Sequence, residues 1–80
     1  MPRSPSVSAQ EKLQLLLRQV RSEARLTQTE VAERVGQPQS FVSKYESGER
    51  RLDVLELRAV CSAMGIALPD FIKRMERVLG

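Results

Sequence analysis

The side chains best equipped for molecular recognition lie between positions 28 and 51 of this 80-residue chain. They carry amide, hydroxyl, ammonium and guanidinium groups and are Gln28, Gln39, Ser40, Ser43, Lys44, Arg50 and Arg51. An amide places a hydrogen-bond donor beside an acceptor, and a guanidinium group suits phosphates and guanine edges. With thirteen basic against ten acidic residues, the net charge of +3 is consistent with a polyanionic partner.

The residue types needed for catalysis, metal coordination or disulfide formation are scarce in this chain. The chain has no histidine and one cysteine, Cys61, which excludes zinc coordination, His-based catalysis and an intramolecular disulfide. There is no nucleophile–base pair and no phosphate-binding loop, so we predict a protein that is not an enzyme and needs no cofactor or metal. Cys61 is expected in the core, the alternative being a redox role.

Length and hydropathy indicate a single small domain. Eighty residues are near the size at which one core is only marginally sufficient, so dimerisation is a plausible supplement. No apolar run approaches about 18 residues and no signal peptide is visible, which predicts a cytoplasmic protein without a membrane partner.

Two short helices joined by a tight turn must position the recognition side chains. Thr27 and Glu30 have capping-box spacing before a helix over 28–35, and Gly36 follows where the chain must turn with positive φ. A second helix is predicted over 39–46. Apolar residues recur at helical spacing on the inward sides of both: Val31, Ala32, Val35, Val42 and Tyr45.

Three further helices are predicted at about 8–24, 54–64 and 69–78, and no segment alternates with the period of a strand. Residues 1–7 are predicted to be a flexible arm. Apolar stripes mark the three helices: Leu13, Leu16, Leu17, Val20 and Ala24; Val54, Leu55, Leu57, Val60, Cys61 and Met64; Phe71, Ile72, Met75, Val78 and Leu79. The fold class is therefore all-α.

This arrangement resembles the helix-turn-helix of the lambda repressor/Cro-like (XRE) family. The matching residues are Gln28, Ala32, Gly36, Val42, Tyr45, Glu46, Ser47 and Gly48, and the likeness extends over most of the chain. It implies a compact five-helix lambda repressor-like domain over 8–80, with the motif at the second and third helices. Gln37, Pro38 and Leu52 depart from the family pattern, and Pro38 leaves the second motif helix without its usual side-chain cap.

The resemblance also implies sequence-specific binding of double-stranded DNA, with the second motif helix in the major groove. Gln39 would bind adenine N6 and N7, while Gln28 would orient Gln39 and touch a phosphate. The remaining polar residues would contact bases or phosphates: Ser40, Ser43, Lys44, Arg50 and Arg51.

Phe41, Arg21 and Arg3 each have a specific prediction. Phe41 either points partly outward, against thymine methyl groups, or packs against a neighbouring helix. From the resemblance, Arg21 is expected to form a structural ion pair with Glu46. In the arm, Arg3 either reaches DNA or belongs to a disordered end.

The predicted function is a transcriptional repressor that reads a palindromic operator as a homodimer and needs no small-molecule ligand. Candidate dimer contacts are Ile72, Met75 and Leu79, although this last helix could simply close the core. The alternative is an antitoxin-like module, or another DNA-binding module that depends on a protein partner.

Overall fold

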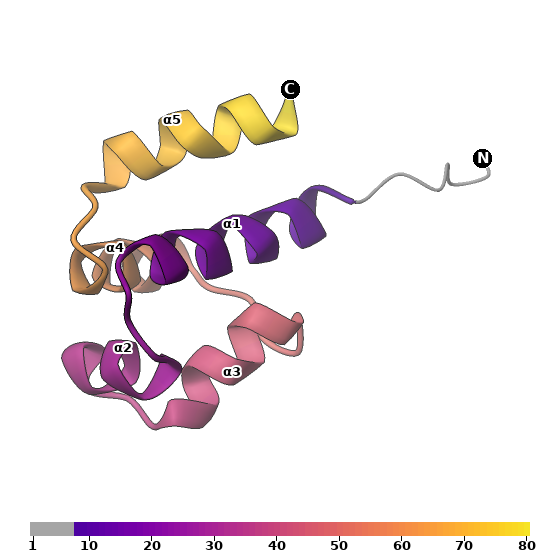
Figure 1. Ribbon diagram of the computed structural model, residues 1–80. Coiled ribbons are helices and arrows are strands. Elements are labelled where there is room, and N and C mark those ends of the chain that lie inside the picture. The colour runs from indigo at the N-terminus through magenta and orange to yellow at the C-terminus, as the bar shows by residue number, and fades with distance from the viewer. Residues whose placement is uncertain (1–7) are drawn as a thin grey trace.

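The computed structural model describes residues 8–80, which fold into five α-helices and no strand, as the sequence predicts (Figure 1). The proposed arm, with Arg3, lies outside the described residues. In chain order the helices are α1 (Ala9–Glu23), α2 (Gln28–Val35), α3 (Gln39–Ser47), α4 (Val54–Ala63) and α5 (Leu68–Leu79).

Local sequence signals explain most helix ends. Reciprocal capping boxes open α1, α2 and α4, using the pairs Ser8 and Glu11, Thr27 and Glu30, and Asp53 and Glu56. Gly36 ends α2 at φ 73° and Gly48 ends α3 at φ 89°, the left-handed region that glycine adopts without steric cost. Pro38 provides no side-chain cap, yet α3 still begins at Gln39.

The helices form one core. α2 packs against α3, α1 against α3, and α4 against α2, while α5 crosses α1 and α4 on the side away from the α2–α3 pair (Figure 1). The most deeply buried large side chains come from every helix: Leu17, Val31, Val42, Tyr45, Val60, Cys61 and Phe71. Burial raises the pKa of the Cys61 thiol to about 11, so Cys61 behaves as the core residue that was predicted.

The predicted apolar stripes of α1, α4 and α5 are all shorter than expected, and Val78 and Leu79 at the end of α5 are 41% and 37% exposed. Val54 and Leu55 are 65% and 74% exposed, because they occupy the first turn of α4, whereas the buried residues of this helix begin at Val60. Ala24 is also exposed, since α1 ends at Glu23 and Arg25 turns the chain with φ 59°. None of the helices within residues 8–80 has the length and hydropathy needed to cross a membrane.

Candidate nucleic-acid interface

The two sides of α3 differ sharply in character. Val42 and Tyr45 point into the core, whereas Gln39, Ser40 and Lys44 are exposed and Ser43 is half-buried. Three of the four polar residues assigned to this helix therefore project into solvent, beginning at its N-terminal turn. An exposed polar helix face that starts at its first turn matches the way a recognition helix enters the major groove.

The first of these residues is held by the neighbouring helix. The Nε2 group of Gln39 donates to Oε1 of Gln28 at 2.7 Å, and Nε2 of Gln28 donates to Oε1 of Glu46 at 3.0 Å. The contact between the two amides is the one that the resemblance implies. The link from Gln28 to Glu46 has no counterpart in the sequence analysis.

Glu46 is the only buried charged residue of the part that the structure describes, and Arg21 neutralises it. Arg21 Nε and Nη2 donate to the two carboxylate oxygens at 2.7 and 3.0 Å, and Arg21 Nη1 donates to the Leu26 carbonyl at 3.0 Å. Burial by itself raises the pKa of Glu46, but hydrogen bonds from Arg21 and Gln28 outweigh it and leave that pKa below its ordinary value. The carboxylate is therefore charged at neutral pH.

Phe41 does not point outward. The residue is only 8% exposed, and its ring meets the Tyr45 ring edge-on, with centroids 5.6 Å apart. The guanidinium of Arg50 covers it at 4.7 Å from the centroid. Phe41 thus packs against its neighbours, because the loop after α3 returns over the helix and covers a position that the helical period alone leaves half-exposed. Of the two alternatives for Phe41, the one in which it points outward against thymine methyl groups is wrong.

Arg50 already has a protein partner. Its Nη1 and Nη2 atoms donate to the two Glu56 carboxylate oxygens at 3.0 and 2.7 Å. Hydrogen bonds from Arg50, and then from the Asp53 backbone, lower the pKa of Glu56 to about 2. The structure therefore ties Arg50 into a Phe41–Arg50–Glu56 cluster and leaves Arg51 as the exposed arginine of this loop. Sequence reasoning missed the cluster, because the capping-box spacing of Asp53 and Glu56 accounts for Glu56 without an arginine partner.

Comparison with known proteins agrees with this geometry. A helix-turn-helix family model matches residues 17–71. An XRE-family-like protein from Pseudomonas syringae pv. tomato str. DC3000 is 42% identical, with a TM-score of 0.83 over 90% of this chain and 88% of that one. The chain belongs to the XRE-type helix-turn-helix family. It is a DNA-binding transcriptional regulator.

More distant structures share the fold of this XRE-type chain. The clp gene regulator ClgR from C. glutamicum is 24% identical, with a TM-score of 0.80 over 98% of this chain and all of that one. The restriction-modification controller protein C.Esp1396I, solved as a tetramer with its natural 35-base-pair operator, is 17% identical, with a TM-score of 0.82 over 94% of this chain and all of that one. No match was found among curated proteins.

Proposed function

We propose that this protein is a sequence-specific repressor that binds a palindromic operator in double-stranded DNA as a homodimer. The observation that carries the proposal is the exposed N-terminal turn of α3, where Gln39 is held by Gln28. A side chain fixed before binding loses less conformational entropy when it meets a base edge. Gln39 is therefore the main base reader in the proposal.

The other polar residues divide between bases and the sugar-phosphate backbone. Ser40, Ser43 and Lys44 follow Gln39 along α3 and reach base edges or nearby phosphates. Arg51 is exposed in the loop after α3 and binds a phosphate. Arg50 is assigned to the Phe41–Arg50–Glu56 cluster and contributes to phosphate binding mainly through its charge. The first turn of α2, beside Gln28, offers a further phosphate site.

Dimerisation is proposed through α5. Ile72 and Met75 are half-buried and Leu79 is 37% exposed, so apolar surface remains along this helix after the core is closed. One copy would contact only a few base pairs, and a two-fold dimer doubles the sequence that is read.

Selection from a random duplex library at near-physiological salt tests this function. We expect an inverted repeat with half-sites about one helical turn, or roughly 10 base pairs, apart. Retained duplexes that share no sequence motif, and that no longer bind as the salt concentration rises, would show that binding is only electrostatic. This result would contradict the proposal. The exposed pair Val54 and Leu55 would then favour the alternative, a module that acts through a protein partner.

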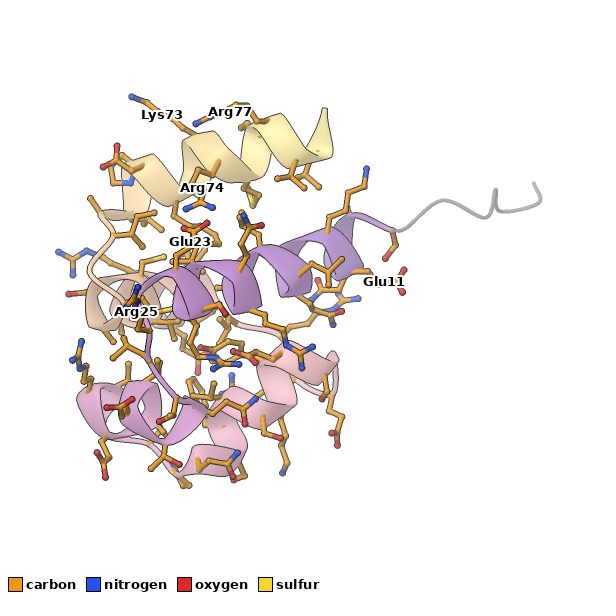
Figure 2. All side chains as sticks on the ribbon, in the orientation of Figure 1. Glu11, Glu23, Arg25, Lys73, Arg74 and Arg77 are labelled. Carbon is orange, nitrogen blue, oxygen red and sulfur yellow. The ribbon has the colours of Figure 1, made fainter. Side chains whose placement is uncertain are left out.

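Two substitutions test the separate assignment of Gln39 to a base and of Arg51 to a phosphate. Gln39→Ala should relax base preference at one position per half-site, with a loss of about 1–3 kcal/mol on the preferred sequence. Arg51→Ala should weaken binding to all sequences alike and reduce the salt slope by about one. Lys73→Ala is the matched control, because Lys73 projects from α5 on the side away from α3 (Figure 2). Equal effects of Gln39→Ala and Arg51→Ala on every sequence would contradict the assignments.

A further inference from the structure

We propose that the surface between α2 and α4 is a docking groove for an acidic amphipathic helix of a partner protein. This α2–α4 groove is separate from the exposed first turn of α3. Its lining residues come from the end of α2 and from α4: Arg34, Val35, Arg58, Ala59, Ser62 and Ala63. The inference goes beyond the proposed function, since it concerns a second partner and can be tested without DNA.

The α2–α4 groove is shallow, with a largely apolar floor. Its volume is about 500 Å³, and the small side chains of Ala59 and Ala63 leave room for another chain to approach α4 closely. Leu55 lies four residues before Ala59, on the same side of α4, and is 74% exposed. The row from Leu55 to Ala63 extends over about 12 Å, or roughly two helical turns. An exposed apolar row of this kind marks a surface for protein contact.

Two guanidinium groups line the groove, and none of its lining residues is acidic. Arg34 Nη1 donates to the Ala63 carbonyl at 2.9 Å, which anchors the side chain, while its other N–H groups have no hydrogen-bond partner within residues 8–80. Arg58 is exposed and forms neither a hydrogen bond nor an ion pair in that part of the chain. No acidic residue lies three or four positions from Arg58 along α4. The groove therefore presents positive charge that lacks a carboxylate partner.

The kind of segment that fits this groove follows from the rest of the fold. Extended peptides bind by adding a strand to a sheet edge, and proline-rich peptides bind in grooves lined by aromatic rings. Residues 8–80 contain no strand, and Phe41, Tyr45 and Phe71 are all buried. The mode that remains is an amphipathic helix whose apolar residues lie in the groove. Acidic residues beside that apolar row would pair with Arg34 and Arg58.

Helices of a second copy fit the groove less well. α5 exposes Val78 and Leu79, but it also exposes Arg77, whose charge would be repelled by the arginines of the groove. Glu30 and Glu33 are exposed on α2, but no apolar residue of that helix is exposed beside them. Residues 1–7 contain no acidic residue. A phosphate backbone would also gain nothing from the apolar floor, so the occupant is assigned to another protein.

Selection from a display library of acidic amphipathic helices tests the proposal, with these peptides as the probes. Each peptide has about 14 residues, roughly four turns, with varied apolar residues at i, i+3, i+4 and i+7 and glutamate on the other face. We expect the full chain to enrich a set of peptides. Arg58→Glu should weaken their binding by about tenfold, because it reverses one of the two charges of the groove. Ala59→Trp should weaken it similarly, since the indole fills the hollow without changing the charge.

Lys73→Glu is the matched control for charge. It changes the net charge by the same amount as Arg58→Glu, but Lys73 projects from α5 on the side away from α2 (Figure 2). Peptide affinity should therefore change by less than about twofold in this variant. Arg58, Ala59 and Lys73 are all exposed, so the three variants should fold, and circular dichroism checks that they do.

Four results would overturn the inference. They are the absence of enriched peptides, and an equal loss of peptide affinity in Lys73→Glu, which would show attraction by net charge alone. A change in the sedimentation of Ala59→Trp would place a second copy in the groove. A fall of about one in the salt slope of DNA binding by Arg58→Glu would place a phosphate there. Each of these results leaves the assignment of Gln39 to a base untouched, so failure here is distinct from failure of the proposed function.

Discussion

Among individual residues, the buried polar groups differ in whether they have hydrogen-bond partners. Glu46 is stabilised by three donor groups, two from Arg21 and one from Gln28. The Tyr45 hydroxyl is also buried, but no group within residues 8–80 forms a hydrogen bond with it. Removing a partner from a satisfied charge and removing an unsatisfied hydroxyl should therefore have opposite effects.

The Arg21–Glu46 pair should be strongly coupled in a double-mutant cycle. Either Arg21→Ala or Glu46→Ala should lower the free energy of unfolding by about 3–5 kcal/mol, because the remaining charge loses its hydrogen-bonded ionic partner in a largely buried site. Urea denaturation of both single variants and the double variant gives the coupling energy. Additive losses would mean that the two side chains stabilise the fold independently, against this expectation.

Tyr45→Phe should keep the stability or raise it by up to about 1 kcal/mol, because the buried hydroxyl is desolvated without a compensating bond. The ring contact with Phe41 is retained in this variant. Tyr45→Ala serves as the contrast and should cost about 3–5 kcal/mol, as for other large core truncations. A loss of more than 1 kcal/mol in Tyr45→Phe would show that the hydroxyl has a stabilising partner.

At the scale of the secondary-structure elements, the turns after α1 and α2 both require a residue with positive φ, but different residue types occupy that position. α2 ends on Gly36 at φ 73°, whereas the turn after α1 places Arg25 at φ 59°. A side chain in the left-handed region costs roughly 1–2 kcal/mol. The end of α1 therefore contains strain that the end of α2 avoids.

Introducing glycine at Arg25 and removing it at Gly36 should change the free energy of unfolding in opposite directions. Arg25→Gly should raise the free energy of unfolding by about 0.5–1 kcal/mol, and Gly36→Ala should lower it by about 1 kcal/mol. A Cβ atom at Gly36 meets no atom within 4 Å, so the second effect reports the backbone alone. Ser22→Gly, inside α1, is the control and should destabilise by roughly 0.5–1 kcal/mol. A lower denaturant midpoint in Arg25→Gly would show that the Arg25 side chain stabilises the fold by more than its backbone strain costs.

For the whole molecule, the paired carboxylates predict how stability depends on pH. The pKa values of Glu46 and Glu56 lie below the ordinary value of 4.5, that of Glu56 at about 2. The folded state thus binds protons less readily than the unfolded chain. Its stabilisation is fully present above pH about 4.5 and is lost as the pH falls toward 2.

Thermal unfolding between pH 7 and pH 2 checks this expectation. The midpoint temperature should change little from pH 7 to 5, because the chain has no histidine, and should then fall steeply. Glu56→Gln should flatten the lower part of this fall, since its side chain cannot be protonated there. An identical acid profile in Glu56→Gln would mean that the pairing with Arg50 adds no pH-dependent stability.

Local sequence signals are sufficient to predict the helices and much of the motif. Capping residues, glycines and apolar spacing act within one or two turns, and so five helices and the α2–α3 turn could be predicted from the chain alone. The amide contact of Gln28 with Gln39, and the pairing of Arg21 with Glu46, came from resemblance to a family. Periodicity could not have supplied them, because their partners are far apart in the chain.

Which helix faces are covered depends on packing between segments that are distant in the chain. Phe41 is buried because Arg50 lies over its ring, and Val54 and Leu55 are exposed because no neighbouring helix reaches the first turn of α4. The hydrogen bonds from Gln39 to Gln28 and from Gln28 to Glu46 likewise join side chains of α2 and α3. A helical period states which residues share a face, whereas burial and long-range hydrogen bonds depend on what packs against that face.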